Sequence, residues 1–533
     1  MPKPLKLRGT IASQGYAEGV LFVLSTSAGT YRSSGDAGAE ERTLRDAIAK
    51  ASRQVAELMA AQGGDNADIL EFQLAMLDDD ALSTPAYDAI ARGRDAAGAW
   101  SGALENQIAD YDSADDEYFR ARAADLRDIR DRVVQALTGG EAIRPQSGAV
   151  LYGDDITPSQ FLACDWSKGG GIMLRLGSGT SHVAMLARAK GVPMLVGVAG
   201  VAAKGGETVL LDAENGAITI SPDSFAVASF RQKSIAERAR RQSAMSLARR
   251  PASTRDGTPI SVGVNIAEPG DVETIDIATC DGVGLMRTEF LFNAGLPDEE
   301  TQYRAYRKVL EWAEDKPVTI RTVDAGGDKP VPGFTVEETN PFLGLRGIRL
   351  ALSRPDVFRV QVRALLRAAV HGNLKVMLPM ISVPEEYAAA EALFEAEAAD
   401  FEAAGVTHWL PPLGIMVEVP AVAIAPERFE NAAFLSIGSN DLTQYVMAAG
   451  RDNGAVAALA DVSNPAILSL IANVVRFGKE QNIPVSLCGD AGGDPGLIPA
   501  LLGTGLRSVS VAPAQLPRAK LAIAEIDLVV RAA

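Results

Sequence analysis

Histidine, cysteine and long apolar runs are all scarce in this chain of 533 residues. The three cysteines, Cys164, Cys280 and Cys488, lie too far apart in the sequence for a disulfide framework or a zinc site. No uninterrupted run of about 20 apolar residues occurs, so we expect no membrane-spanning helix. The N-terminus, MPKPLKLRGT, lacks the apolar core of a secretory signal. We therefore expect a cytoplasmic protein.

Basic residues are also in deficit, since 51 Lys and Arg stand against 68 Asp and Glu, a formal net charge of −17. This charge argues against nucleic acid as a partner and fits a partner protein whose docking face is basic. A hydrophobic content of 47% and a charged content of 22% are those of an ordinary globular protein. The length allows three or four domains of roughly 100–200 residues each.

The expected secondary structure changes twice along the first half of the chain. Residues 5–24 predict short strands around glycine turns, and residues 36–139 carry apolar residues at helical spacing. Alternating strands and helices return over residues 145–221. We therefore predict a small α/β domain formed by residues 1–28 and 143–222, with a helical subdomain, residues 29–142, inserted into it. The charged residues 223–252 have no strong apolar stripe and are expected to form a linker helix.

The second half contains eight strand-like apolar runs, most of them separated by helical segments. They are residues 259–266, 282–287, 317–324, 374–381, 413–420, 433–441, 484–490 and 508–513. Continuous apolar runs are typical of parallel strands that are buried on both faces. Eight such units over residues 253–533 match the length of a (β/α)8 barrel. The predicted fold class is therefore α/β throughout.

Polar residues close nearly every apolar run of the predicted barrel. They are Asn265, Arg287, Arg321, Glu418, Asn440, Asp441 and Cys488. Taken singly, each of these residues could be an ordinary polar loop residue. As a set they indicate an active site, because the carboxyl ends of barrel strands form it in this fold and charged side chains on apolar strands need partners.

The types of these residues predict a small, multiply anionic phosphate compound chelated by Mg2+. Four cations are available, and arginine grips phosphate or carboxylate with two hydrogen bonds; they are Arg287, Arg321, Lys329 and Arg346. Glu418 and Asp441 are hard oxygen donors of the kind that holds Mg2+ beside a substrate phosphate. The alternative is that the cations form buried salt bridges with these acids. Four cations against two acids leave an excess of positive charge for a ligand.

Cys488 has two interpretations. A lone cysteine in an apolar setting most often acts as a small hydrophobe. At a strand end, before Gly489 and Asp490, it could instead give and take a proton.

His182, one of only three histidines, lies in the stretch GSGTSHVAMLARAKGVP. Ser181 or Thr180 is a good N-cap, and Gly191 followed by Pro193 makes a natural stop, so His182 is expected in the first turn of a helix. That position favours an anion and disfavours the imidazolium, and glycine and hydroxyl groups nearby would meet a phosphate. The alternative is a structural histidine that caps its own helix.

Taken together, one domain is predicted to carry a phosphoryl group on histidine and another to bind a phosphorylated anion with Mg2+. The pair predicts phosphoryl transfer through a phosphohistidine.

Long motifs in the chain resemble those of a known family. GTSHVAMLARAKGVPMLVG resembles the phosphohistidine signature of PEP-utilizing enzymes. The stretches DGVGLMRTEFLF, RTVDAGGDK, NPFLGLRGIR, GIMVEVPA, SIGSNDLTQY and SLCGD look like the successive phosphoenolpyruvate (PEP) site motifs of enzyme I of the phosphotransferase system. DDEYFRARAADLRDIRDRV looks like the part of that family that binds the phosphocarrier HPr. The resemblance covers nearly the whole chain, in order.

The resemblance implies that His182 takes the phosphoryl group from PEP and passes it to a histidine of HPr or an HPr-like carrier. This would be the first step of a phosphotransferase system, which serves sugar transport. Cys488 would protonate the enolate to give pyruvate, and Glu418 and Asp441 would bind Mg2+. The remaining site residues would hold PEP; they are Arg287, Arg321, Arg346, Lys329, Asn440 and Arg451. The family forms homodimers through the barrel.

Three positions depart from the family pattern, and three phosphocarriers remain open. The loop LGSGTSH replaces a common Gly-Gly-Arg run, Asp490 replaces a frequent Glu, and Gln73 stands where the family often has a histidine on the expected docking surface. The carrier could be a sugar-type HPr, a nitrogen-type relative or a multidomain carrier of dihydroxyacetone phosphorylation.

Two other functions are alternatives to this one. A dikinase or PEP synthase needs an ATP-grasp region of a few hundred residues, for which only the helical block has room. A regulatory scaffold without catalysis would be favoured by loss of His182, Cys488 or a metal carboxylate, and all are present.

Overall fold

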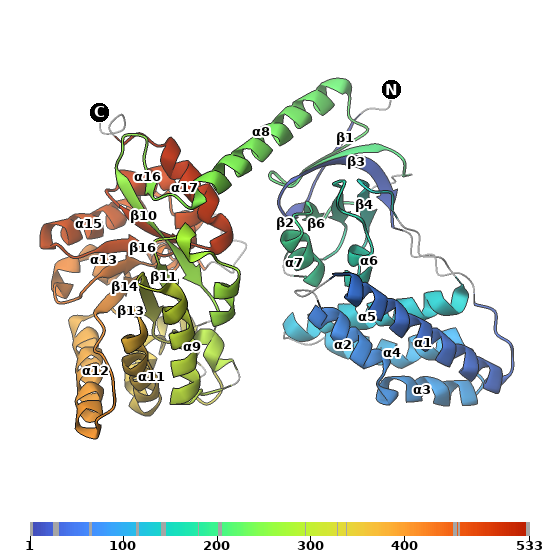
Figure 1. Cartoon of the computed structure of the whole chain (residues 1–533), viewed down its shortest axis with the longest axis horizontal. Helices are drawn as coiled ribbons and strands as arrows, with labels where there is room; N and C mark the ends of the chain where they lie inside the picture. The colour runs from blue at the N-terminus through green and yellow to red at the C-terminus, as the bar shows by residue number, and fades with distance from the viewer. Residues whose placement is uncertain are drawn as a thin grey trace. The chain divides into compact units, whose positions relative to one another are not determined.

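The computed structural model divides into two compact units, Met1–Glu237 and Arg238–Ala533, each described here by itself (Figure 1). The residues that it describes are 4–24, 31–62, 67–112, 117–139, 145–177, 179, 181–200, 205–293, 295–327, 329–336, 338–450, 456 and 459–528. Within these ranges, no helix is both long enough and apolar enough to cross a membrane.

The first unit is built on a mixed sheet of eight strands in the order β1-β8-β7-β3-β4-β5-β6-β2. The strands β3, β4, β5 and β6 run parallel, while β1, β2, β7 and β8 pair antiparallel at the two sides. Their bounds are β1 Leu5–Arg8, β2 Thr10–Ser13, β3 Tyr16–Val23, β4 Val150–Gly153, β5 Gly171–Leu174, β6 Met194–Val196, β7 Thr208–Asp212 and β8 Ala217–Ile220. Two short helices, α6 Pro158–Leu162 and α7 His182–Ala189, follow β4 and β5.

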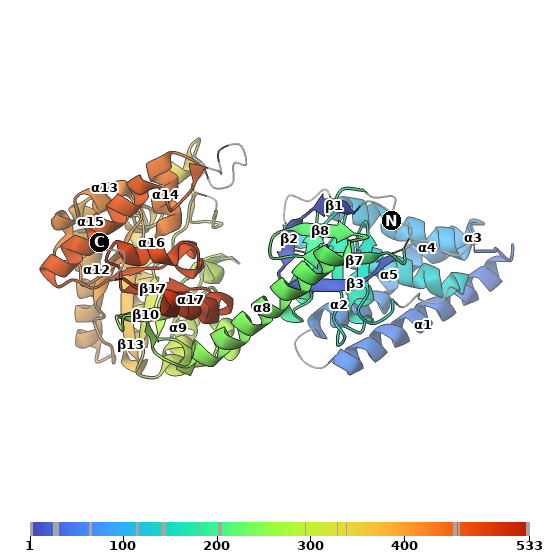
Figure 2. The same cartoon turned by 90° about the horizontal axis from the view of Figure 1, so that it is seen from above.

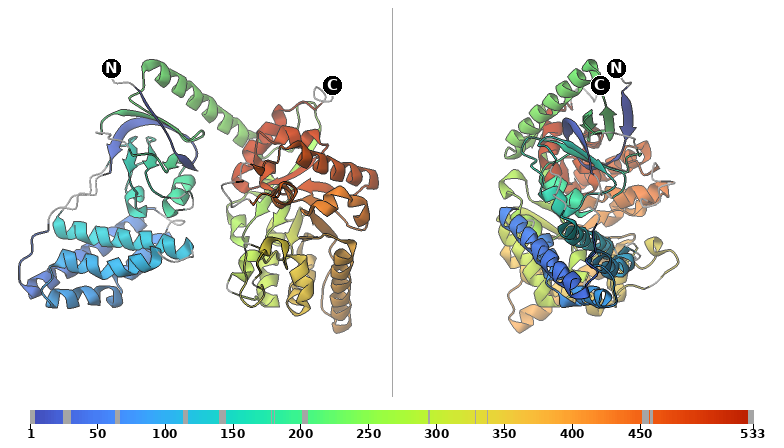
Figure 3. Two further views of the ribbon diagram at one scale, coloured as in Figure 1. Left: turned by 180° about the vertical axis from the view of Figure 1, so that it is seen from behind. Right: turned by 90° about the vertical axis from the view of Figure 1, so that its right-hand side faces the viewer.

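Five helices between β3 and β4 form a bundle on the side of the sheet where α6 and α7 lie (Figures 1 and 3). They are α1 Ala37–Gln62, α2 Ala67–Leu77, α3 Asp80–Ala91, α4 Ala96–Asp112 and α5 Glu117–Thr138. One apolar core joins the bundle to the sheet, because Trp100 and Leu126 of the bundle belong to the same buried cluster as Phe161 and Leu174. The predicted insertion of a helical subdomain into an α/β domain is therefore confirmed.

Gln73 on α2 is part of this joint between the bundle and the sheet. Its side chain is fully buried and donates from Nε2 to Asp128 Oδ2 on α5, at 2.9 Å. Asp128 in turn accepts hydrogen bonds from the hydroxyl and the backbone N–H of Ser159 on α6, at 2.6 and 3.2 Å. The expectation that Gln73 lies on a docking surface is wrong, because the residue is a core link between three helices.

Helix α8, Ser224–Ala248, contains the boundary between the two units. Its first part packs on the first unit, where Arg231 pairs with Glu18 and Phe230 stacks edge-on against Tyr16. Its last part packs on the second unit beside α17, Leu516–Glu525 (Figure 2). There the buried ammonium of Lys520 donates to the carbonyls of Ala248 and Arg250, at 2.7 and 2.9 Å. A lysine in this place satisfies helix-end carbonyls and complements the negative end of the helix dipole.

The second unit is a closed barrel of parallel strands. Among the described residues it has eight, in the order β11-β12-β13-β14-β15-β16-β17-β10, and β10 closes onto β11; the short β9, Ala252–Ser253, pairs antiparallel with β10. Each predicted apolar run contains one strand. They are β10 Pro259–Ile266, β11 Val283–Met286, β12 Pro317–Arg321, β13 Asn373–Leu378, β14 Leu413–Val417, β15 Leu435–Ile437, β16 Val485–Leu487 and β17 Ser508–Val511. The (β/α)8 prediction is confirmed.

Helices surround the barrel and bury their apolar faces against it. They are α9 Glu299–Ala313, α10 Ile348–Ser353, α11 Pro355–Ala368, α12 Pro384–Ala404, α13 Pro420–Ile424, α14 Ser439–Met447, α15 Pro465–Gln481, α16 Ile498–Gly503 and α17. Several strands end earlier than the sequence suggested. Asn440 and Asp441, expected at the end of a strand, lie instead in the first turn of α14.

We predict that Glu40, in the first turn of α1, holds the bundle together at neutral pH. Its buried carboxylate accepts from Tyr31, Ser33, both polar groups of Ser34 and the N–H of Ala96. Burial alone would raise its pKa, but the hydrogen bonds from Ala96 and Ser34 lower it to about 2. This stabilisation is present above the unfolded pKa of about 4.5 and is lost as pH falls toward 2.

Replacing Glu40 by Gln should therefore cost about 1–3 kcal/mol of unfolding free energy at pH 7 and much less at pH 3. Urea unfolding followed by circular dichroism at both pH values measures the difference. Glu41→Gln is the matched control, because Glu41 pairs with Arg45 on the exposed side of the same helix turn. A Glu40→Gln variant as stable as the control at pH 7 would contradict the assignment.

Candidate active site

The polar residues predicted at the strand ends do converge at the carboxyl end of the barrel. Arg321 is the last residue of β12, and Arg287, Glu418 and Cys488 each come directly after β11, β14 and β16. Because parallel strands of a barrel end on the same face, these side chains share one environment. The charges confirm this, since Arg321, Glu418 and Arg287 all act on the pKa of the Cys488 thiol.

Two carboxylates missed at the sequence level dominate this environment. Glu289 accepts a hydrogen bond from Arg321, and Asp324 lies 3.4 Å from the same guanidinium. Burial is the largest single influence and would raise both carboxyl pKa values, but the neighbouring cations, Arg321 first among them, together outweigh it and lower them. Both acids stand beside strand-end arginines inside the stretches MRTEF and RTVDAGG. The search for polar residues at the ends of apolar runs, which identified Arg287 and Arg321, could therefore have identified Glu289 and Asp324 as well.

Asp324 is the centre of the charge cluster and is fully buried. Its two oxygens accept from Arg346 Nε and Nη2, both at 3.0 Å, in the bidentate geometry typical of arginine and carboxylate. The ammonium of Lys329 lies 3.6 Å away. Arg346 is itself fully buried and also contacts Asp441 at 3.3 Å and the hydroxyl of Tyr445 at 3.1 Å.

The expected excess of positive charge is smaller than two acids implied. Glu289 and Asp324 join Glu418 and Asp441, so four cations stand beside four acids, of which Glu418 keeps its proton at neutral pH. Arg321 and Arg346 are held in buried ion pairs, as the alternative interpretation proposed. An anionic substrate must therefore share these cations with the carboxylates, or replace a carboxylate at one of them.

Two buried polar atoms of the cluster nevertheless have no hydrogen-bond partner among the described residues: Nε of Arg321 and Oε2 of Glu418. Such atoms are rare in folded proteins and mark strain, function or a missing ligand. The other oxygen of Glu418 accepts from the N–H of Met380, at 2.6 Å. Met380 is buried with a φ of 60°, a costly conformation for a residue with a side chain. We found no sequence signal for this strained residue.

Glu418 is fully buried among other acids. Burial, together with the charges of Asp324 and Asp441, raises the pKa of its carboxyl to about 8. The carboxyl group of Glu418 therefore keeps its proton at neutral pH.

Cys488 is buried in one apolar cluster with Met377 and Met416. Burial raises the pKa of its thiol to about 11, so the sulfur keeps its proton at neutral pH. Its carbonyl accepts from Asn265 Nδ2 at 3.1 Å, which fixes the backbone at the end of β16. A protonated, water-excluded thiol fits a proton donor better than a nucleophile.

Asn440 forms a reciprocal pair with Asp490, which stands where the family often has Glu. Asn440 Nδ2 donates to the Asp490 carboxylate at 2.8 Å, and the Asp490 N–H donates back at 3.2 Å. The shorter acid is long enough to hold Asn440. Lys329 is about a third exposed and lies 3.5 Å from Glu289, whereas Arg287 is exposed.

His182 is the first residue of helix α7 in the first unit. Ser181 is the N-cap, and its hydroxyl accepts from the N–H of Ala184 at 3.2 Å. Arg188 on the same helix donates to the carbonyls of Gly179 and Ala12, at 2.7 and 2.8 Å, and so ties the loop before His182 to β2. The predicted place of His182 in a first helical turn agrees with the structure. Its side chain, all of Thr180 and all of Arg451 lie outside the described residues.

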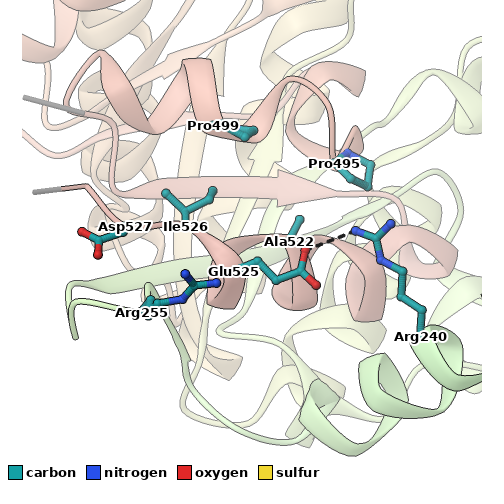
Figure 4. Close-up of a pocket in the computed structure, with 8 residues that line it drawn as sticks. All are labelled: Arg240, Arg255, Pro495, Pro499, Ala522, Glu525, Ile526 and Asp527. Carbon is teal, nitrogen blue, oxygen red and sulfur yellow. Dashed lines mark hydrogen bonds and ion pairs between the residues drawn. The ribbon is translucent and has the colours of Figure 1, made fainter. Parts of the chain in front are cut away.

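A hollow of about 400 Å³ elsewhere on the second unit contains none of the predicted site residues (Figure 4). Its charged lining is Arg240, Arg255, Glu525 and Asp527. Arg240 and Glu525 pair across it at 3.3 Å, and both are about half exposed. Exposed pairs of this kind contribute little, and the hollow belongs to the contact between α8 and α17.

Three family models match most of the chain. A model described as PEP-utilising enzyme, PEP-binding domain, matches residues 241–528. Models of the N-terminal part and of the mobile domain of PEP-utilising enzymes match residues 8–122 and 145–216. The chain belongs to the PEP-utilising enzymes.

Several relatives of this PEP-utilising enzyme are named phosphoenolpyruvate-protein phosphotransferase. The chain is 37% identical to that of Geobacillus stearothermophilus over 97% of its own length and 93% of the relative. It is 38% identical to that of Haloferax volcanii, over 87% and 83% of the two chains. It is 35% identical to that of Bacillus subtilis, over 98% and 95%. The chain is thus an enzyme of the phosphoenolpyruvate-protein phosphotransferase family, which confirms the resemblance.

The acids of this PEP-utilising enzyme fit Mg2+. The unpartnered Oε2 of Glu418 is a hard oxygen in a buried position, and Asp441 lies close enough for its charge to act on Glu418. Within the described residues, no group of three or more His, Cys, Asp or Glu side chains is gathered as a metal site. Mg2+ needs no such group, because it commonly binds one or two carboxylates together with substrate oxygens and water.

We predict that Mg2+ binding by this PEP-utilising enzyme weakens as pH falls below about 8. The proton on Glu418 must leave before its carboxylate can bind a cation, so the affinity should fall about tenfold for each pH unit below that pKa. Calorimetric titration of Mg2+ with pyruvate present, in two buffers of different ionisation enthalpy, counts the released proton. Glu418→Gln should bind Mg2+ weakly and without this release. Equal proton release in wild type and variant would contradict the prediction.

We also predict that Cys488→Ser slows pyruvate formation by about 100-fold or more, because a hydroxyl is a weaker acid than a thiol. Affinity for PEP should change far less, since the replacement is nearly isosteric. Solvent-proton incorporation into pyruvate and calorimetric PEP affinity separate the two steps. Turnover equal to that of wild type would remove Cys488 from the mechanism.

Proposed function

We propose that this enzyme transfers the phosphoryl group of PEP to its own His182 and then to a histidine of HPr or an HPr-like carrier, with release of pyruvate. The observation that carries the proposal is the pair of unpartnered buried atoms, Arg321 Nε and Glu418 Oε2, in one cluster. One is a donor suited to an anionic oxygen and the other an acceptor suited to a cation. A PEP anion chelated by Mg2+ supplies both.

In the proposed reaction, a nitrogen of His182 attacks phosphorus and the bond from phosphorus to the enol oxygen breaks. The electron pair stays with the enolate, and the Cys488 thiol protonates its terminal carbon to give pyruvate. The thiolate then recovers a proton from solvent. Mg2+, held by Glu418 and Asp441, would neutralise charge on the transferring group.

The cations have different parts in this proposal. Arg321 has a free donor, and Arg287 and Lys329 are at least partly exposed, so these three are suited to meet PEP directly. Arg346 contacts PEP only if it gives up a hydrogen bond to Asp324, Asp441 or Tyr445. Asn440 and Arg451 are assigned to substrate binding by resemblance, and the pairing of Asn440 with Asp490 supports a fixed position for the first of them.

The phosphohistidine would lie at the positive end of α7. The first N–H groups of a helix have no partner within the helix and favour an anion. Ser181 already uses its hydroxyl as the N-cap acceptor but keeps a proton to donate. We assign Ser181 and Thr180 to support of the phosphoryl group on this basis.

The helical bundle is the proposed docking site of the carrier. Between α1, α2 and α3 it has a groove of about 380 Å³ that combines apolar and acidic side chains. Leu77 and Tyr87 line it together with Asp78 and Asp80, and Arg45 stacks on the Tyr87 ring at 4.2 Å. Such a groove suits a partner with a basic rim around an apolar patch. The part of the resembling region before residue 123 has no described side chains.

The predicted domains are retained as proposals. Residues 1–28 and 143–222 form the phosphohistidine domain, 29–142 the carrier-binding subdomain, 223–252 the linker and 253–533 the PEP-binding and dimerisation barrel. The boundary between the compact units falls inside the proposed linker, which supports this division. A homodimer through the barrel, a cytoplasmic location and a role in sugar uptake stay predictions.

The test uses purified enzyme, Mg2+ and labelled PEP, with mass spectrometry to locate acid-labile phosphate. Label on His182 and one pyruvate per label are expected, and His182→Ala should abolish the label while PEP still binds. His408→Ala is the matched control, since it removes the same side chain from the loop between α12 and β14. Bound PEP without label in wild type, or label retained in His182→Ala, would contradict the proposal.

A further inference from the structure

A buried glutamine behind the barrel site connects the two loops that carry its arginines and acids. Gln361 lies on α11 with only 1% of its surface exposed. Its Oε1 accepts from the N–H of Val323, at 3.0 Å. Its Nε2 donates to the hydroxyl of Tyr306 at 3.0 Å and, more weakly, to that of Thr288 at 3.4 Å.

Two partners of Gln361, Thr288 and Val323, lie between charged residues in the loops after β11 and β12. Thr288 stands between Arg287 and Glu289 after β11, and Val323 stands between Arg321 and Asp324 at the end of β12. Thr288 also donates to the carbonyl of Arg321, at 3.0 Å. One side chain therefore fixes the backbone beside four charged residues of the candidate site.

The direction of every bond in this network is determined. Only the oxygen of the amide can accept from the Val323 N–H, so its NH2 group faces the two hydroxyls. The Tyr306 hydroxyl, having accepted from Gln361, donates to Gln302 at 3.0 Å, and Gln302 donates to the carbonyl of Pro297 at 3.2 Å. The chain of bonds thus leads from the site back to the start of α9. Fully satisfied buried networks of this kind rigidify their surroundings.

We propose that Gln361 is a positioning residue for PEP-dependent phosphorylation: it holds the loops after β11 and β12 so that Arg287, Arg321, Glu289 and Asp324 keep their mutual geometry. Gln361 touches none of the reacting groups. It acts through Val323 and Thr288, and small displacements of charged groups in such a site are costly in rate. This inference rests on the proposed function.

The test compares two ways of phosphorylating His182. Labelled PEP requires the barrel site, whereas a phosphorylated carrier such as HPr, run in reverse, does not. Gln361→Met, which keeps the volume and removes the hydrogen bonds, should lower the rate of labelling from PEP about 10- to 100-fold. Labelling from the phosphorylated carrier should be unchanged.

Tyr306→Phe is the matched control within the network. It removes the hydrogen bond from Gln361 to the Tyr306 hydroxyl, which does not involve the two loops, and keeps the bonds of Gln361 to Val323 and Thr288. Labelling from PEP should therefore stay near the wild-type rate. Thermal unfolding of both variants shows whether they are folded. Should Gln361→Met fail to fold, Thr288→Val, which removes the hydroxyl that accepts from Gln361 and donates to the carbonyl of Arg321, should still lower the rate of labelling from PEP alone.

Equal loss of both labelling reactions, or no loss in either, would overturn the inference. Equal loss in Gln361→Met and Tyr306→Phe would also overturn it, because the effect would then be one of general stability. If wild type binds PEP but is not labelled, the proposed function fails instead. In that case the affinity for PEP, measured by calorimetry, tests the inference. We expect a lower affinity in Gln361→Met than in Tyr306→Phe, and equal affinities would overturn the inference.

Discussion

The barrel site depends on one buried carboxylate, that of Asp324. It lies within 3.6 Å of Arg321, Lys329 and Arg346, three cations that would otherwise repel one another in a space that excludes water. The attraction between the Asp324 carboxylate and these cations is strong because the local dielectric is low. This attraction keeps the carboxyl group ionised although burial disfavours its charged form. The arginines are therefore already oriented before any substrate arrives. Such preorganisation is the main means by which enzymes stabilise charge that develops during phosphoryl transfer.

The same cluster separates two kinds of carboxylate by their surroundings. Asp324 and Glu289 face guanidinium groups and have lowered pKa values, whereas Glu418 faces other acids and has a raised one. The first two hold cations of the protein, and the third has an oxygen with no partner among the described residues. Met380, with its strained backbone, supports this division, because its N–H occupies one oxygen of Glu418 and leaves the other open. Environment, rather than residue type, thus assigns each acid its part.

The sequence predicts the fold well because each barrel strand is a continuous apolar run closed by a polar residue. It also places Arg321, Glu418 and Cys488 correctly, since strand ends of a barrel converge whatever the loop lengths. It could not place Arg346 or Gln361, which lie at the end of a loop and on a helix, because their neighbours are set by tertiary packing. The predicted charge balance was too positive for a related reason: Glu289 and Asp324 were left out of the count, although they are partners of the cations that were counted.

Gln73 illustrates how a substitution in a core can alter the response of a protein to its surroundings. The resembling family often has an imidazole at this position, a group that changes its charge near pH 6.5. An amide neither gains nor loses a proton in that range. The link from Gln73 to Asp128 and on to Ser159 therefore keeps the same donor while the medium acidifies. At this described position of the joint between the helical bundle and the sheet, α2 thus contributes an amide that mild acid does not protonate.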